Sequence, residues 1–304
     1  MTDPIDCLIV GGGPAGLTAA IYAARFRLSV RVIDAGGSRA GLIACTRNQA
    51  GFPAGISGLE LLARMGRQAT QFGAGIDRGR VTRVSINKRD FAVDTNIGLA
   101  RARTVLLATG VTNRQPGIAG DLHSAALAAG RLRYCPVCDG FEVLDQDVAV
   151  IGTSKRGVKE ALFLRAYTKK VSLIAPTGRH RLTLGERKAL ASADIQIADG
   201  PVSDFELDES GLGFKSALGK RTFEAVYPAM GSVAHSELAR ELGADLTSER
   251  CIKTDAHQRT SVPGLYAAGD VVIGLDQISH AMGEAGVAAA TIRNDLVARR
   301  PLLR

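Results

Sequence analysis

The hydrophobic pattern at the start of the chain predicts a strand, a turn, a helix and a second strand. Residues 6–10 form a short apolar run, and residues 11–16, Gly-Gly-Gly-Pro-Ala-Gly, interrupt it. Residues 17–26 are rich in alanine, and residues 29–33 form a second apolar run that ends at Asp34. This order, with a glycine-rich first turn, is typical of a βαβ unit.

The same pattern returns in the middle of the chain. Residues 147–151, 152–157, 158–167 and 171–175 repeat the strand, the turn, the helix and the second strand. One offset, without a gap, relates Gly11 to Gly152, Gly16 to Gly157 and Asp34 to Ala175. A strand followed by glycine at residues 106–110 is repeated at 227–231. We therefore expect an α/β fold with two Rossmann-like (three-layer) domains of the nucleotide-binding type.

Three further segments complete the pattern. Residues 78–94 alternate and predict an antiparallel hairpin. Residues 261–270 predict a turn and a buried strand that ends in an acid, and residues 283–294 predict a closing helix of small residues.

Composition limits the possible functions. The chain has 304 residues, is 46% hydrophobic and carries a net charge of +8, but it has no tryptophan and no basic stretch with interleaved aromatics. Nucleic-acid binding is therefore not expected. The first residues resemble no signal peptide, and no apolar run approaches the ~20 residues of a membrane helix. We expect a cytoplasmic protein without a membrane segment.

The first glycine turn has the features of a dinucleotide site. Gly11 permits the tight turn, Gly13 lets a pyrophosphate approach the backbone, and Gly16 allows close packing of helix on strand. The helix N-terminus favours phosphate, so Pro14 and Ala15 belong to the expected site. Asp34 can accept hydrogen bonds from ribose hydroxyls. The alternative is a glycine turn without a ligand.

Two later strand ends favour FAD over NAD as the ligand. Thr109-Gly110 and Gly269-Asp270 each follow a buried run, and the carboxyl ends of strands are where α/β sheets bind ligands. Asp270 suits a ribityl hydroxyl, and it can also serve as a helix N-cap.

Two of the five cysteines are paired in sequence, in Cys135-Pro136-Val137-Cys138. Such a motif can be half of a zinc site, but no second motif supplies the remaining ligands, so we expect no metal. Short C-x-x-C loops form a disulfide and lower the pKa of one thiol. The alternative is two incidental thiols. For the isolated Cys7, Cys45 and Cys251 the expectation is a small buried hydrophobe.

The motifs together resemble the low-molecular-weight thioredoxin reductases over essentially the whole chain. They stand in the family's order at residues 11–16, 108–110 (Ala108-Thr109-Gly110), 135–140 and 267–270. The resemblance implies a FAD domain of residues 1–113 plus 237–304, an inserted domain of residues 114–236 that carries the cysteines, and a homodimer.

The resemblance also implies roles for individual residues. Cys138 would face the flavin, Cys135 would attack the partner's disulfide, and Asp139 would be their acid–base. Asp139 can equally be a turn or capping residue. The family's Arg-Gln-Ala segment, whose backbone amides can stabilise negative charge on the flavin, stands here as Asp276-Gln277-Ile278. His280 lies in the same segment. We expect it to be a surface histidine rather than a catalytic base.

The second glycine turn departs from the family's NADPH-binding members. Ser154 replaces the second glycine. The next strand ends in Ala175-Pro176-Thr177, which offers neither an acid for the ribose nor arginines for the 2′-phosphate of NADPH. Lys155, Arg156, Arg179 and Arg181 remain as cations near the turn. The chain therefore looks most like the deeply rooted thioredoxin reductase-like branch that lacks the NADPH motifs.

The function expected from the sequence is that of a FAD-dependent disulfide oxidoreductase. Electrons would pass between the flavin and the Cys135–Cys138 disulfide to a thioredoxin-like partner, from a donor other than NADPH. The alternatives are a dithiol oxidase that acts on a small dithiol, an NADPH-dependent reductase with an atypical NADPH site, and a non-catalytic flavin redox sensor.

Overall fold

The computed structural model describes residues 3–88 and 90–299. These residues form two compact units. Among these residues, unit 1 takes the chain up to Leu42, Ser57–Thr112 and the chain from Val233 onwards; unit 2 takes Ile43–Ile56 and Asn113–Ser232. The sequence predicts residues 43–56 in the first domain, whereas in the structure they pack with unit 2. The chain passes between the units in β7 (Val111–Asn113) and β15 (Ser232–Ala234), which pair as a two-stranded sheet.

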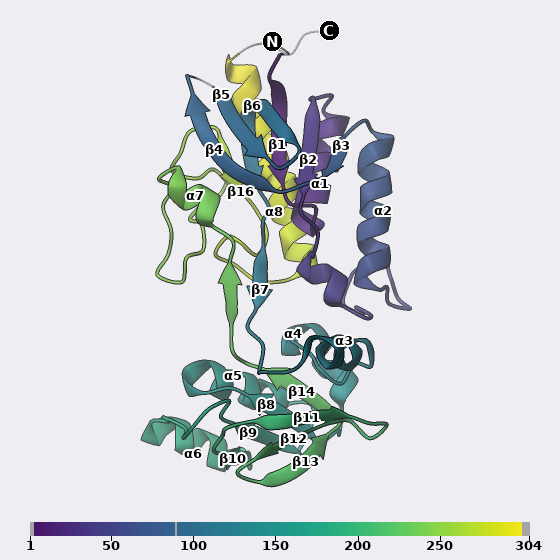
Figure 1. Cartoon of the computed structure of the whole chain (residues 1–304), viewed down its shortest axis with the longest axis vertical. Helices are drawn as coiled ribbons and strands as arrows, with labels where there is room; N and C mark the ends of the chain where they lie inside the picture. Colours follow the sequence, from purple (N-terminus) through teal and green to yellow (C-terminus); the bar gives the residue numbers. More distant parts are fainter. Residues whose placement is uncertain (1–2, 89, 300–304) are drawn as a thin grey trace. The chain divides into compact units, whose positions relative to one another are not determined.

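Unit 1 is built on a seven-stranded sheet of order β3-β2-β1-β6-β5-β4, with β16 also paired to β6 (Figure 1). Its strands are β1 (Ile5–Val10), β2 (Val30–Asp34), β3 (Gly75–Arg78), β4 (Val81–Asn87), β5 (Asp90–Thr95), β6 (Gly98–Leu107) and β16 (Leu265–Ala267). Its helices are α1 (Pro14–Arg25), the 3₁₀ helix η1 (Arg39–Leu42), α2 (Gly58–Gln71), α7 (Glu237–Glu241) and α8 (Ile278–Arg299).

The sheet of unit 1 is parallel at its centre. β1 pairs in parallel with β2 and β6, and β16 pairs in parallel with β6. The hairpin β4–β5 is antiparallel, as predicted, and continues from the N-terminal half of β6. The carboxyl ends of β1, β6 and β16 therefore reach one edge of the sheet, where ligands bind in folds of this kind.

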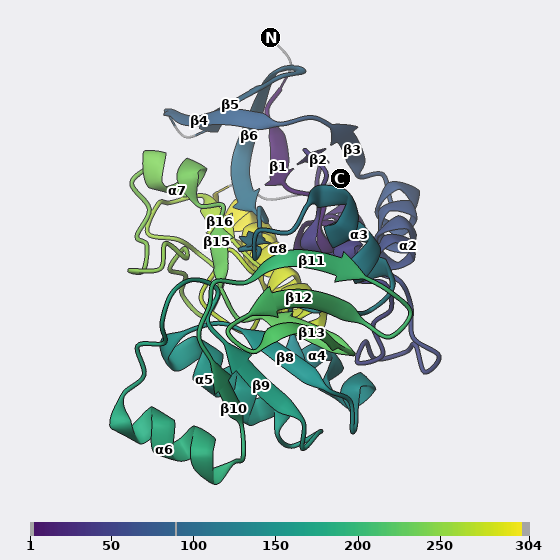
Figure 2. The ribbon, with the colours of Figure 1, turned by 60° about the horizontal axis from the view of Figure 1, so that its bottom comes forward.

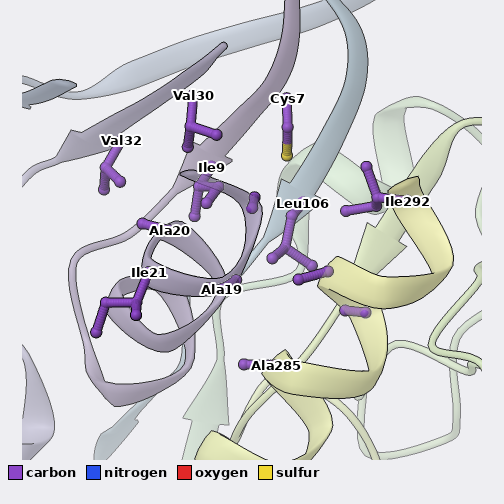
Figure 3. Close-up of a cluster of buried hydrophobic side chains, with 14 of the residues drawn as sticks. Cys7, Ile9, Ala19, Ala20, Ile21, Val30, Val32, Leu106, Ala285 and Ile292 are labelled. Carbon is purple, nitrogen blue, oxygen red and sulfur yellow. The ribbon is translucent and has the colours of Figure 1, made fainter. Parts of the chain in front are cut away.

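Small side chains let α1 and α8 pack closely on one face of this sheet (Figure 3). Ala19 and Ala20 of α1 and Ala285 of α8 meet Ile9 and Leu106 of the sheet, and all five are almost fully buried. The other face is covered by a second apolar cluster that includes residues of β4 and β5. The result is the predicted three-layer arrangement. Cys7 lies in the first cluster, and burial raises its pKa to about 12.

Unit 2 repeats the strand–turn–helix plan with a four-stranded parallel sheet of order β10-β9-β8-β14. Its strands are β8 (Val148–Ile151), β9 (Val171–Ile174), β10 (Gln196–Ala198) and β14 (Ala225–Pro228), with a separate antiparallel sheet of β11 (Ser203–Leu207), β12 (Leu212–Ser216) and β13 (Gly219–Phe223). Its helices are α3 (Gly120–Ala128), α4 (Pro136–Asp139), the 3₁₀ helix η2 (Gly140–Val143), α5 (Ser154–Leu164) and α6 (Leu184–Ser192).

Unit 2 is also layered, because apolar residues on both faces of its parallel sheet are covered. Helices α5 and α6 pack on one face, and the antiparallel sheet with α3 packs on the other (Figure 2). The two units thus share a fold class. Within the described residues, no helix has the length and apolar character needed to cross a membrane.

The helices begin earlier than the hydrophobic pattern suggested. α1 starts at Pro14 and α5 at Ser154, both inside the glycine turns, and α8 starts five residues before residue 283. Glycine and proline in the turn hide the first helical turn from a pattern of apolar spacing. Pro14 suits this place because its missing N–H would be unsatisfied there in any case.

Candidate functional site

The glycine turn after β1 has room for a side chain at only one of its three motif glycines. A Cβ atom on Gly11 would overlap the carbonyl oxygen of Ala108, and one on Gly16 would overlap that of Gly11. A Cβ on Gly13 would meet only the Ser38 Oγ, at 3.2 Å. Packing therefore requires the first and third glycines, whereas the second keeps the backbone approachable.

The N-terminus of α1 is open toward an anion. Gly13 is its N-cap, no side chain among the described residues caps it, and its first turn carries no acid. The backbone N–H groups of Ala15 and Gly16 lie in this first turn, where N–H groups have no intrahelical partner. Orphan donors and the helix dipole both favour a phosphate there. The turn thus fits the pyrophosphate of FAD.

Asp34, at the end of β2, fixes the glycine turn by hydrogen bonds to its backbone. Its Oδ1 accepts hydrogen bonds from the backbone N–H groups of Gly12 and Gly36, both at 3.0 Å. Its Oδ2 lies 3.5 Å from Nη1 of the exposed Arg78. One carboxylate oxygen is therefore structural, and the other is the one that can face a ribose.

The residues that follow β6 and β16 lie against the glycine turn. The N–H of Ala108 donates to the carbonyl of Val10 at 2.9 Å. Gly269 has a φ of +81°, and a Cβ there would lie 2.8 Å from the Cβ of Ala15. After β6, Thr109 Oγ1 donates to the carbonyl of His235 at 2.6 Å. The His235 N–H donates to the carbonyl of Gly110 at 3.0 Å.

Asp270 carries an ion pair that the sequence did not reveal. Nη1 of Arg39 lies 3.1 Å from Oδ2 of Asp270 and 2.7 Å from Oδ2 of Asp276. Burial raises the pKa of Asp270, Asp276 raises it further, and Arg39 opposes both effects. Asp276 stands where the family has arginine, and the pair with Arg39 gives this acid a structural role.

The segment after Asp276 starts the long helix α8. Gln277 accepts the N–H of Ala281 at 2.9 Å, so that α8 begins at Ile278. Nε2 of His280 lies 3.1 Å from Oε1 of Glu284, and Oε2 of Glu284 accepts the N–H of Gly269 at 2.7 Å. The histidine therefore supports the loop after β16.

Cys135 and Cys138 form a disulfide in unit 2. Cys135 is the N-cap of α4, and the N–H of Cys138 donates to its Sγ at 3.1 Å. The N-terminus of a short helix and a donated N–H both favour a thiolate at Cys135 once the disulfide is reduced. Of the remaining cysteines, only Cys7 is buried, and Cys45 and Cys251 are partly exposed.

Asp139 follows the disulfide and has both carboxylate oxygens engaged. Oδ2 lies 2.8 Å from Nη1 of Arg133, and Oδ1 accepts the hydroxyl of Tyr227 at 2.9 Å. Burial raises the pKa of Asp139, while Arg133 and then Tyr227 oppose the rise. Asp139 therefore lies in a turn and also makes side-chain contacts to Arg133 and Tyr227. Neither Arg133 nor Tyr227 had a sequence signal, because each is recognisable only by its partner.

The second glycine turn shares the packing of the first but not its backbone. A Cβ on Gly152 would lie 3.0 Å from the carbonyl oxygen of Ala229, which repeats the contact of Gly11 with Ala108. The position that corresponds to Gly13 is Ser154, which adopts a φ of +53°. In the first turn the positive φ belongs to Gly11, and Gly13 has a φ of −78°. The side chain and the backbone therefore both differ where a pyrophosphate would lie.

The structure places the predicted site residues in two groups. Unit 1 holds the expected FAD ligands, which gather at the edge where β1, β2, β6 and β16 end: Gly11, Gly13, Pro14, Ala15, Gly16, Asp34, Ala108, Thr109, Gly110, Gly269, Asp270, Gln277 and Ile278. Unit 2 holds Cys135, Cys138 and Asp139. Within the described part of the chain, no cluster of three or more His, Cys, Asp or Glu side chains is arranged to hold a metal.

Comparison with known proteins identifies the family. Residues 5–285 match the model of the pyridine nucleotide-disulphide oxidoreductases. A thioredoxin reductase of Treponema pallidum is 36% identical over 89% of this chain and 90% of its own length. One of Streptomyces coelicolor is 32% identical over 100% of this chain and 95% of its own.

A solved structure agrees with these sequence matches. The thioredoxin reductase of Streptococcus pyogenes superposes with a TM-score of 0.88, is 30% identical, and covers 97% of this chain and 98% of its own. Proteins of this family are FAD-binding flavoproteins, in agreement with the open glycine turn of unit 1. The chain belongs to the pyridine nucleotide-disulphide oxidoreductase family, within which it is a thioredoxin reductase-like, flavin-dependent disulfide oxidoreductase.

Proposed function

We propose that this protein carries electrons between FAD in unit 1 and the Cys135–Cys138 disulfide in unit 2, and that it reduces a thioredoxin-like partner. The observation that carries the proposal is the disulfide itself, formed at the start of a helix with an acid directly after it. FAD supplies a two-electron exchange with the disulfide when it is bound.

In this proposal the ligands of FAD are the strand-end residues of unit 1. The N-terminus of α1 binds the pyrophosphate, Oδ2 of Asp34 accepts a ribose hydroxyl, and Asp270 accepts a ribityl hydroxyl. Arg39 orients Asp270 through their 3.1 Å ion pair. The backbone amides at the start of α8 stabilise negative charge on the flavin ring.

The cysteines have different tasks. Cys138 exchanges electrons with the flavin, and Cys135 attacks the partner's disulfide as a thiolate. The support for the second task is local, since Cys135 Sγ already accepts the N–H of Cys138. Asp139 exchanges protons with the pair.

We also propose that the electron donor is not NADPH. The support is the second glycine turn, where Ser154 has a positive φ, and the end of β9, where Ala175 is buried and no cation follows before Arg179. A homodimer in the cytoplasm completes the proposal, and its support is the family resemblance. Light scattering on the purified protein tests the assembly.

The test of the cysteine roles is the visible spectrum of two single variants. In Cys135→Ser the remaining Cys138 should lie as a thiolate against oxidised FAD and give a long-wavelength charge-transfer absorbance. In Cys138→Ser this absorbance should be absent. Both variants should fail to reduce a thioredoxin-like disulfide.

The controls use the same samples. Denaturation should release one FAD per chain from each variant, and the double variant Cys135→Ser/Cys138→Ser should show the flavin spectrum without the long-wavelength band. Equal spectra in the two single variants, or the band only in Cys138→Ser, contradict the assignment. Protein that takes up no FAD contradicts the function as a whole.

A further inference from the structure

Asp139 is fixed by two residues that come from separate parts of unit 2. Arg133 lies six residues before it and holds Oδ2 at 2.8 Å, and Tyr227 of β14 holds Oδ1 at 2.9 Å. The side chains of Arg133 and Asp139 are 19% and 22% exposed, and Tyr227 is fully buried. A carboxylate with both oxygens engaged has one orientation.

The backbone brings the two holding residues together. The N–H of Arg133 donates to the carbonyl of Val226 at 2.9 Å, and the N–H of Val226 donates to the carbonyl of Arg131 at 2.8 Å. The segment of Arg133 thus pairs with β14 directly beside Tyr227. The Nε of Arg133 is buried without a hydrogen-bond partner among the described residues, and Nη1 of the same guanidinium pairs with Asp139.

The environment of Asp139 contains opposing influences. Burial and the nearby Glu142 favour the neutral acid, whereas Arg133 and Tyr227 favour the carboxylate. Glu142 itself has a buried Oε2 without a hydrogen-bond partner among the described residues. Removal of Arg133 therefore takes away the cation that pairs with Asp139 and the largest influence that opposes its burial.

We propose that Arg133 and Tyr227 are positioning residues that keep Asp139 ionised and oriented, so that it takes a proton from the reduced cysteine pair. The inference rests on the proposed function. In thiol–disulfide exchange the attacking sulfur must lose its proton as the new S–S bond forms, and the partner's leaving sulfur departs as a thiolate. Cys135 forms a mixed disulfide with the partner as the partner's S–S bond breaks, and Asp139 passes the proton of Cys135 to the leaving sulfur. Cys138 then attacks Cys135, which re-forms the Cys135–Cys138 disulfide and releases the partner's second sulfur. The proton of Cys138 passes through Asp139 to that sulfur, so that two electrons and two protons reach the partner.

The first measurement is the pKa of Asp139 in the oxidised holoprotein, from the ¹³Cγ shift of labelled aspartate. The Asp139→Asn variant assigns the signal. In Arg133→Met the pKa should rise by about one unit or more, because an adjacent arginine lowers a carboxyl pKa by 1–3 units. Arg133→Lys should restore most of the difference, and Tyr227→Phe should give a smaller rise.

The matched control is Arg131→Met. Arg131 lies two residues away but donates to the backbone carbonyls of Glu224 and Glu209, not to Asp139. Its loss should leave the Asp139 signal in place. An unchanged Asp139 pKa in Arg133→Met, or an equal shift in Arg131→Met, overturns the inference and leaves the proposed function standing.

The second measurement connects this pKa to the thiols. The reduced holoprotein is alkylated with iodoacetamide over a range of pH, and modification of Cys135 is followed by mass spectrometry. The lower inflection of the rate should move upward in Arg133→Met by the same shift as the Asp139 pKa, and it should vanish in Arg133→Met/Asp139→Asn. If the Asp139 pKa moves and the alkylation profile does not, Asp139 has no proton role, and that part of the proposed function fails.

Discussion

At the scale of single residues, the titration of Glu160 should make the stability of the protein depend on pH. It lies in α5, and burial raises its pKa to about 7, although Arg156 opposes the rise. Between pH 4.5 and 7 the folded chain keeps a proton that the unfolded chain has released. The free energy of unfolding therefore falls as pH rises through this window, by roughly 3 kcal/mol. Glu160→Gln should remove this loss, so that the variant is more stable than the wild type at pH 8.

Urea unfolding of the two proteins at pH 4, 6 and 8 measures the effect. Their difference in stability should be small at pH 4 and should grow up to pH 7. The exposed Glu209→Gln serves as the control for a lost negative charge in the same unit. A difference that is constant with pH would show that Glu160 is not perturbed.

At the scale of elements, two helical glycines should respond to alanine with opposite signs. In α5, a Cβ on Gly157 would lie 2.8 Å from the carbonyl carbon of Gly152. In α2, Gly66 has open space where a Cβ would be. Alanine favours a helix by about 1 kcal/mol over glycine. Gly66→Ala should therefore stabilise the protein by that amount.

Gly157→Ala should instead destabilise the protein by about 1–3 kcal/mol, because overpacking against a backbone forces the helix away from the turn. Urea unfolding followed by circular dichroism, with FAD in excess, compares both variants with the wild type. If both variants changed the free energy of unfolding in the same direction, helix propensity would determine the effect of alanine at both positions. The close approach of α5 to its turn would then not matter.

At the scale of the whole molecule, unit 2 has the layers of a nucleotide-binding domain, and the proposal that NADPH is not its donor rests on Ser154 and on the end of β9. The loss of two or three charge-assisted contacts, each worth ~1.5–3 kcal/mol, weakens binding by several orders of magnitude. We expect millimolar NADPH without oxygen to reduce the bound flavin more slowly than about once per second, the lower end of ordinary enzyme turnover.

Stopped-flow absorbance of the flavin measures this rate, and dithionite, which needs no binding site, should bleach the same sample completely. Ser154→Gly should raise the rate with NADPH only slightly, because the end of β9 still supplies no cation for the 2′-phosphate. Complete bleaching of the wild type by NADPH within a second would assign the protein to the NADPH-dependent reductases.

The sequence by itself determined the layered α/β fold, its internal repeat and the cysteine pair. These features depend on neighbours along the chain: the apolar runs of residues 6–10 and 147–151, the glycines of the turns, and the spacing of Cys135 and Cys138. The period of a strand or helix, and the steric requirements of a turn, are determined by residues that are close together in the sequence. The starts of α1 and α5 were missed because glycine and proline interrupt that period.

The tertiary structure alone decided how the acids of the site are held. Arg39 pairs with Asp270 and Asp276 across separations of 231 and 237 residues, and Tyr227 reaches Asp139 across 88. The backbone of Ser154 is likewise a matter of packing, since the same turn in unit 1 has its positive φ two residues earlier. No pattern along a chain encodes such contacts, because the partner of a charge is chosen by which segments the folded sheet brings side by side.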